Sequence, residues 1–225
     1  MPFAKTEELD AVSLSALMSS RLCHDLVNPV GALSSGLEVL GDPAMDQSMQ
    51  EAALDLIKSS AAKSVALLKY ARLAYGASGG AGAELPYDEA KNVLEGLLAW
   101  SKASLDWRIA PAYAPKDEVK ALLVLGAAAA DCVPRGGAIV ITGERGSYDI
   151  KVAGQRVIVQ DDMIRALAGE TAELKPKFTP HYLSGLAARA AGGGVFMIQE
   201  EGAATFKVRF AAELSQTAPS ALTAG

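Results

Sequence analysis

Residues 14–40 read LSALMSSRLCHDLVNPVGALSSGLEVL, and the spacing of their apolar side chains decides the fold that we expect for the first half of the chain. These side chains recur at intervals of three or four residues, which places them along one face of an α-helix. The stripe consists of Leu14, Met18, Leu22, Leu26, Val30, Leu33, Leu37 and Leu40. Gly41-Asp42-Pro43 follows and is expected to end the helix.

A second long helix is expected after this turn. It can begin at Asp42-Pro43 or at the capping box formed by Ser48 and Glu51, and it continues to about Tyr75. Two helices joined by a short turn form an antiparallel hairpin, but one hairpin alone cannot bury both apolar stripes. Two hairpins can bury them as a four-helix bundle, so we expect residues 1–76 to form a homodimer.

The second half of the chain has a different pattern. Residues 76–83 read GASGGAGA, which is typical of a flexible linker, and we expect a second domain at residues 84–214 and a disordered tail at 215–225. The patterns predict helices at 88–103, 117–132 (capped by Asp117), 161–168 and 180–191, and strands near 85 and at 105–109, 138–144, 148–153, 195–199 and 205–210. The predicted class is therefore α+β, with an α/β sandwich of helices on a mixed sheet after the hairpin.

Composition excludes several classes of function. The net charge of −5 argues against nucleic acid or an anionic membrane as the main partner. Two cysteines are too few for a disulfide framework, and no segment has the length and hydropathy of a membrane span or a signal peptide. We therefore expect a cytoplasmic protein.

The chemistry is expected at His24, which lies two positions from Leu22 and from Leu26 and therefore faces away from the apolar stripe. Asp25 places a carboxylate beside the imidazole, where it can orient the ring and raise its basicity. Arg21 lies one turn before His24 and can meet a phosphate, and Asn28 lies one turn after it and can bond a phosphoryl oxygen or a water. The alternative is an ordinary surface histidine, with the following Pro29 as a simple structural bend.

A partner is expected to dock on the same face of this helix. Ser20, Val27, Gly31 and Ser34 are small or apolar, lie on or beside the His24 face, and suit an inserted partner helix. The alternative is a solvated helix face with incidental small residues. On the second helix, the residues Lys58, Lys63 and Lys69 are interpreted as ordinary surface lysines.

The remaining candidate residues are assigned structural roles. Cys23 and Cys132 are interpreted as packed side chains, because no further Cys or His lies close enough in sequence to complete a metal site. For His181 the alternatives are a role in contacting phosphate and a simple first-turn residue of its helix, and we favour the second. Trp100 and Trp107 are expected to pack in the core of the sandwich.

The string His24-Asp25-x-x-Asn28-Pro29 on a long helix resembles the phosphoacceptor motif of two-component histidine kinases. In those proteins a dimeric helical hairpin, the DHp domain, precedes an ATP-binding α/β domain of the Bergerat or GHKL type. The order of elements here is similar from Leu14 to Phe210. The resemblance implies that His24 accepts phosphate, that Asp25 assists proton handling, and that Asn28 helps phosphoryl transfer.

The motifs that bind ATP in that family are missing from this chain. Ala128 stands where the family has a magnesium-binding asparagine. Residues 152–156 read VAGQR, without the aspartate that recognises adenine, and residues 182–186 read YLSGL, where the family has a glycine-rich phosphate loop. The chain therefore resembles most closely the ChpT-type histidine phosphotransferases of bacterial phosphorelays, which are similar to kinases without ATP binding.

This resemblance implies a phosphorelay. The receiver domain of a hybrid histidine kinase would give its phosphoryl group to His24, and His24 would pass it to the aspartate of downstream response regulators. No cofactor, metal or ATP is expected in this chain, because the Mg²⁺ needed for transfer belongs to the receiver. The alternatives are a divergent ATP-dependent histidine kinase and a non-catalytic adaptor that binds receivers.

Overall fold

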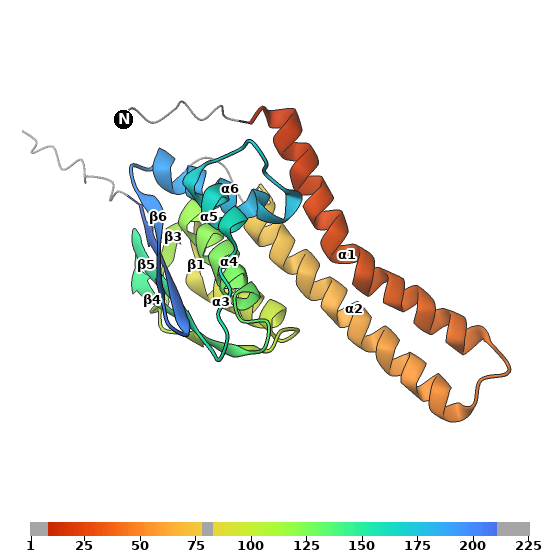
Figure 1. The fold of residues 1–225 in the computed structure, drawn as a ribbon. Helices are drawn as coiled ribbons and strands as arrows, with labels where there is room; N and C mark the ends of the chain where they lie inside the picture. Colours follow the sequence, from red (N-terminus) through yellow and green to blue (C-terminus); the bar gives the residue numbers. More distant parts are fainter. Residues whose placement is uncertain (1–8, 78–82, 211–225) are drawn as a thin grey trace, which may run out of the picture.

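The computed structural model describes residues 9–77 and 83–210 of the 225-residue chain. Its elements follow the predicted order, with two long helices before a mixed α/β region (Figure 1). The tail predicted at 215–225 and most of the predicted linker lie outside the described residues. Neither prediction is therefore tested.

Two long antiparallel helices form the N-terminal hairpin. Helix α1 spans Ala11–Gly41 and is capped by Asp10, whose Oδ1 accepts hydrogen bonds from the backbone N–H groups of Val12 and Ser13, both at 2.9 Å. Helix α2 spans Gln47–Tyr75. Both predicted starts of α2 were wrong, because the side chain of Asp46 provides the cap by accepting from Met49 N at 2.9 Å.

The two helices approach each other closely at Gly36. A Cβ at this position would lie 2.6 Å from Cγ1 of Ile57 and 3.2 Å from the carbonyl oxygen of Ala53, both on α2. A side chain would therefore push the helices apart.

The apolar stripe of α1 is only partly covered in the single chain, since Val30 is 51% and Leu37 is 60% exposed.

The second domain contains the remaining elements. The helices are α3 (Tyr87–Leu98), α4 (Lys116–Asp131), α5 (Asp161–Ala168), the 3₁₀ helix η1 (Pro176–Phe178) and α6 (Thr179–Ala190). The strands are β1 (Glu84–Pro86), β2 (Ala103–Trp107), β3 (Tyr113–Pro115), β4 (Gly137–Glu144), β5 (Ser147–Ala153), β6 (Gly194–Glu200) and β7 (Ala203–Arg209).

Two predictions in this domain were wrong, and one short strand was missed. The helix expected at 88–103 ends at Leu98, because the chain turns there into β2. The short strand β3 was not predicted. Asp117 lies in the first turn of α4 instead of capping it; Pro115 occupies the cap position and makes no side-chain cap bond.

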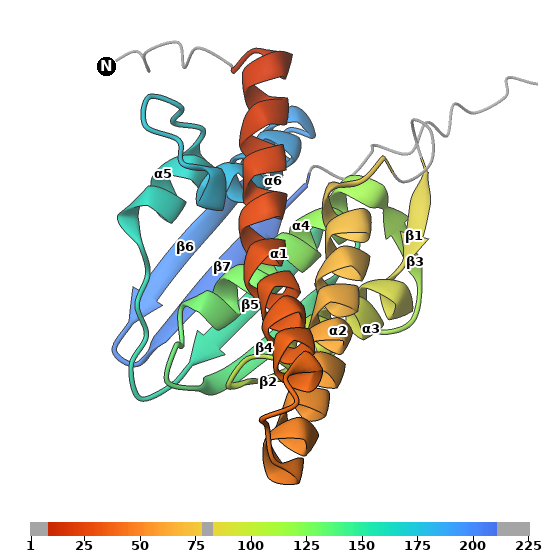
Figure 2. The ribbon, with the colours of Figure 1, turned by 90° about the vertical axis from the view of Figure 1, so that its right-hand side faces the viewer.

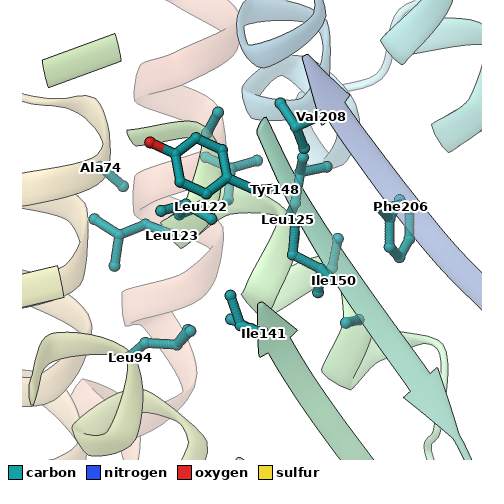
Figure 3. Packing of buried hydrophobic residues seen from close by; sticks show 14 of the residues in the cluster. Ala74, Leu94, Leu122, Leu123, Leu125, Ile141, Tyr148, Ile150, Phe206 and Val208 are labelled. Atoms are coloured by element: carbon teal, nitrogen blue, oxygen red, sulfur yellow. The ribbon is translucent and has the colours of Figure 1, made fainter. Parts of the chain in front are cut away.

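The main sheet has the strand order β2-β4-β5-β7-β6, with β2 and β4 parallel and the other pairs antiparallel. The register places Ile141 opposite Ile150 and Ile150 opposite Phe206, so these side chains form one row across the sheet. All three are fully buried and belong to the same core cluster as Leu122 and Leu125 of α4 (Figure 3). Burial of this row fixes the register, since a shift by one residue would turn it to solvent.

The molecule has three layers. The five-stranded sheet is covered on one face by the helices of the second domain, and the hairpin lies against these helices with its turn projecting away (Figures 1 and 2). The upper part of α1 passes over α6 (Figure 2), which brings the middle of α1 close to the second domain. Within the described part of the chain, no helix combines the length and apolar character needed to span a membrane.

Candidate functional site

His24 lies in the middle of α1 and points into solvent. Its side chain is 81% exposed, as expected for a residue opposite the apolar stripe. Its Nδ1 lies 3.4 Å from Oδ1 of Asp25, whose side chain is only 20% exposed. An imidazole that donates its Nδ1–H to a carboxylate keeps the lone pair of Nε2 free to attack an electrophile. Asp25 therefore lies where it can orient the ring.

Arg21 is engaged by this chain on two sides. Its Nε donates to Oδ2 of Asp25 at 2.7 Å, and its Nη1 donates to the backbone carbonyl of Lys177 in η1 at 3.2 Å. Burial works against the guanidinium charge, but Asp25, Tyr75 and Asp131 together favour it, so the pKa of Arg21 is raised. The side chain is 20% exposed. These bonds already use Nε and Nη1, so they compete with the phosphate contact predicted for Arg21.

A cleft of about 280 Å³ opens beside His24, where the hairpin meets the second domain. Its lining combines segments that are far apart in sequence. The hairpin contributes His24, Asn28 and Lys63, among others, and the second domain contributes residues that include Trp100, Asp131 and His181. Asn28 is exposed, one turn after His24, as the sequence predicted. The phosphoacceptor candidate thus lies at the edge of a concave surface.

Two titratable groups in the wall of this cleft were not predicted. His181 is 7% exposed, and within the described residues its Nδ1 has no hydrogen-bond partner. Burial and the charges of Arg21 and Lys177 lower the pKa of His181 to about 3, so the ring is neutral near neutral pH. Burial also raises the pKa of Asp131 on α4. The sequence showed His181 only as a first-turn residue, and nothing local placed it near His24.

The expected docking residues are all exposed on α1. Ser20, Val27, Gly31 and Ser34 lie on the same side as His24, and Val27 is 65% exposed. A Cβ added at Gly31 would meet no atom within 4 Å, which leaves this part of the face open. Their contact with a partner stays a prediction.

Two of the structural assignments were wrong. Cys23 is exposed, because it lies beside the apolar stripe and the covered part of that stripe does not extend to it. Trp100 is 41% exposed and lines the cleft instead of the core. Trp107 is half-buried against the core, and Cys132 is 2% exposed, where burial raises the pKa of its thiol to about 12.

The positions compared with the ATP-binding motifs have packed side chains or hydrogen-bonded backbone in the structure. Ala128 is 2% exposed on α4 and borders the cleft. Residues 182–186 lie inside α6, where backbone N–H groups bond within the helix, and the side chain of Tyr182 is 3% exposed. Gly154, which follows β5, donates its N–H to the carbonyl of Gly202 at 3.1 Å. These residues take part in packing and in backbone pairing.

Comparison with known proteins assigns the family. Residues 87–203 match the family described as the histidine phosphotransferase C-terminal domain. The protein phosphotransferase ChpT of Brucella abortus (strain 2308) is 36% identical over 169 residues, which cover 73% of this chain and 79% of that protein. A solved bacterial phosphotransferase superposes with a TM-score of 0.80 at 30% identity, over 92% of this chain and all of that one. The fold and these matches define a phosphotransferase. The chain belongs to the histidine phosphotransferase family.

Proposed function

We propose that this chain is the histidine phosphotransferase of a phosphorelay, with His24 as the phosphoacceptor. The observation that supports this role best is the imidazole of His24, which is 81% exposed and has its Nδ1 on Asp25. A nucleophile that serves protein partners must be accessible, and it must keep one nitrogen unprotonated. The side chain of His24 is accessible, and the contact of Nδ1 with Asp25 leaves Nε2 as the nitrogen available for attack, in a chain whose family is known.

The proposed reaction is a pair of in-line transfers. Nε2 of His24 attacks the phosphorus of an aspartyl phosphate on the receiver domain of a hybrid histidine kinase. The P–N bond forms as the P–O bond to the receiver aspartate breaks, and the electron pair leaves with that carboxylate. The reverse step then transfers the group to the aspartate of a response regulator. The receiver supplies Mg²⁺, so this chain contributes nucleophile, orientation and docking surface.

We also propose that the chain does not bind ATP. The side chain of Ala128 offers no oxygen for a metal ion, and the α6 backbone from residue 182 to 186 forms helical hydrogen bonds. Asn28 would bond the phosphoryl group, because it is exposed one turn from His24 on the same cleft.

The proposed form is a cytoplasmic homodimer. On the hairpin, Leu54, Val65 and Leu68 of α2 are 43%, 51% and 50% exposed, in addition to the exposed apolar residues of α1. Pairing two hairpins into a four-helix bundle would remove this apolar surface from water.

Radiolabel transfer tests the proposal. The protein is mixed with labelled ATP alone, and separately with a receiver domain phosphorylated by its own kinase, using wild type and His24→Ala. We expect acid-labile label on the wild type only with the receiver, and none on the variant. Label from ATP alone would instead identify a histidine kinase. An unlabelled protein that still binds the receiver would identify an adaptor.

A further inference from the structure

The two carboxylate oxygens of Asp25 are bound on opposite sides. Oδ1 lies 3.4 Å from Nδ1 of His24, and Oδ2 accepts the Nε–H of Arg21 at 2.7 Å. The side chains of Arg21 and Asp25 are each 20% exposed, whereas that of His24 is 81% exposed. The bond that fixes the carboxylate is therefore sheltered, while the imidazole that it orients faces solvent.

The other end of Arg21 is fixed by the second domain. Its Nη1 donates to the carbonyl of Lys177 at 3.2 Å, which is a backbone group of η1. The next residue, Phe178, is 4% exposed and belongs to the hydrophobic core. The guanidinium therefore joins a well-packed part of the second domain to the carboxylate beside His24.

We propose that Arg21 is a positioning residue for phosphoryl transfer at His24. It holds Asp25 in the orientation that directs Oδ1 to Nδ1, and through Lys177 it ties this orientation to the placement of the second domain. The inference rests on the proposed function, since it requires His24 to be the phosphoacceptor. It assigns Arg21 a different role from contact with phosphate, because two of its donors are already used within the chain.

Loss of Arg21 should slow transfer through the orientation of Asp25. Without the guanidinium the carboxylate can rotate away from Nδ1, and fewer encounters find Nε2 aligned for attack. The maximal rate should then fall about tenfold, since small losses of alignment are costly in transfer reactions.

The experiment measures transfer to the full-length protein from a phosphorylated receiver domain of a hybrid kinase, over a range of receiver concentrations. The variants are Arg21→Met, Asp25→Asn, the double variant, and His24→Ala. We expect Arg21→Met to lower the maximal rate about tenfold with little change in the half-saturating receiver concentration. In the Asp25→Asn background the same substitution should change the rate less than about twofold, because Arg21 acts through Asp25.

Arg72→Met is the matched control. Arg72 also joins the hairpin to the second domain, through an ion pair with Glu89 on α3 at 3.9 Å, but it does not contact Asp25. Its replacement should leave the transfer rate and the half-saturating receiver concentration unchanged.

Three results would overturn the assignment. An equal loss in both Asp25 backgrounds would show that Arg21 acts by packing. A raised half-saturating concentration with an unchanged maximal rate would show that it contacts the partner. Full activity of Arg21→Met would show that it has no role, while loss of activity in His24→Ala would still support the proposed function. Transfer that survives His24→Ala would refute the proposed function itself.

Discussion

Replacing His181 with Gln should reduce the loss of folding stability that occurs as the pH falls. His181 is buried at the start of α6, and burial, Arg21 and Lys177 together lower its pKa to about 3. In the unfolded chain the same imidazole titrates near its ordinary value of 6.5. Protons therefore bind the unfolded state more tightly than the folded one. This contribution to stability is complete above about pH 6.5 and is lost as the pH falls toward 3.

The size of the effect follows from these two values. Linkage gives a loss of about 2 kcal/mol between about pH 7.5 and pH 5 from this single group. Such a change corresponds to a decrease in melting temperature of roughly 4–8 °C for a chain of this size. Asp131 borders the same cleft, and burial raises its pKa, which acts in the opposite direction. Asp25 and Lys63 also line the cleft, so only the difference between wild type and variant isolates His181.

Urea unfolding at both pH values provides the measurement. We expect wild type to lose about 2 kcal/mol more than His181→Gln over this interval. The chain contains two histidines, so His24→Gln is the matched control; its side chain is 81% exposed, and its replacement should leave the wild-type pH dependence in place. Equal losses in wild type and His181→Gln would refute the reasoning.

Three further predictions concern the cleft and the hairpin, and those on phosphoryl loading and receiver binding rest on the proposed function. Lys63→Met should slow phosphoryl loading of His24 about threefold to tenfold, because Lys63 lines the cleft and, within the described residues, forms no ion pair; the exposed Lys69→Met is the control, and equal rates in the two variants would contradict the role. Gly36→Val should destabilise the chain by about 1–3 kcal/mol in urea unfolding, because its side chain would collide with Ile57 and Ala53, whereas Gly31→Ala should not destabilise it. Receiver binding should change the fluorescence of Trp100, which is 41% exposed in the cleft, and the change should vanish in Trp100→Phe; a signal that remains would come from Trp107.

Most of the fold followed from local patterns in the sequence. The hairpin was predictable because a stripe with helical spacing extends over most of α1. The bounds of α5 matched the prediction of 161–168, since Gly169 takes a left-handed conformation with φ of 98° and ends the helix. By contrast, β3 has three residues and ends in Pro115, which is too short for an alternating pattern. The start of α2 was missed because Asp42, Asp46 and Ser48 can each cap a helix, and local sequence does not show which of them does.

The candidate site was predictable only where its residues lie on one helix. Asp25 is next to His24 on α1 and Asn28 lies one turn after it, so helical geometry alone brought them together. The cleft could not be predicted, because His24, Asp131 and His181 are each separated by at least 50 residues in sequence and meet only through tertiary packing. The bond from Arg21 to Lys177 spans 156 residues, so no local pattern could reveal it.

The position of this bond gives a physical reason for the presence of the second domain. The core row of Ile141, Ile150 and Phe206 holds the sheet against which the helices pack, and Phe178 anchors η1 among those helices. The carbonyl that receives Arg21 is therefore fixed by the whole domain. Loss of the domain would leave Arg21 with a bond on one side only, and Asp25 would lose its orientation relative to His24. On the proposed function, the core of the second domain therefore contributes to the alignment of the nucleophile in the hairpin.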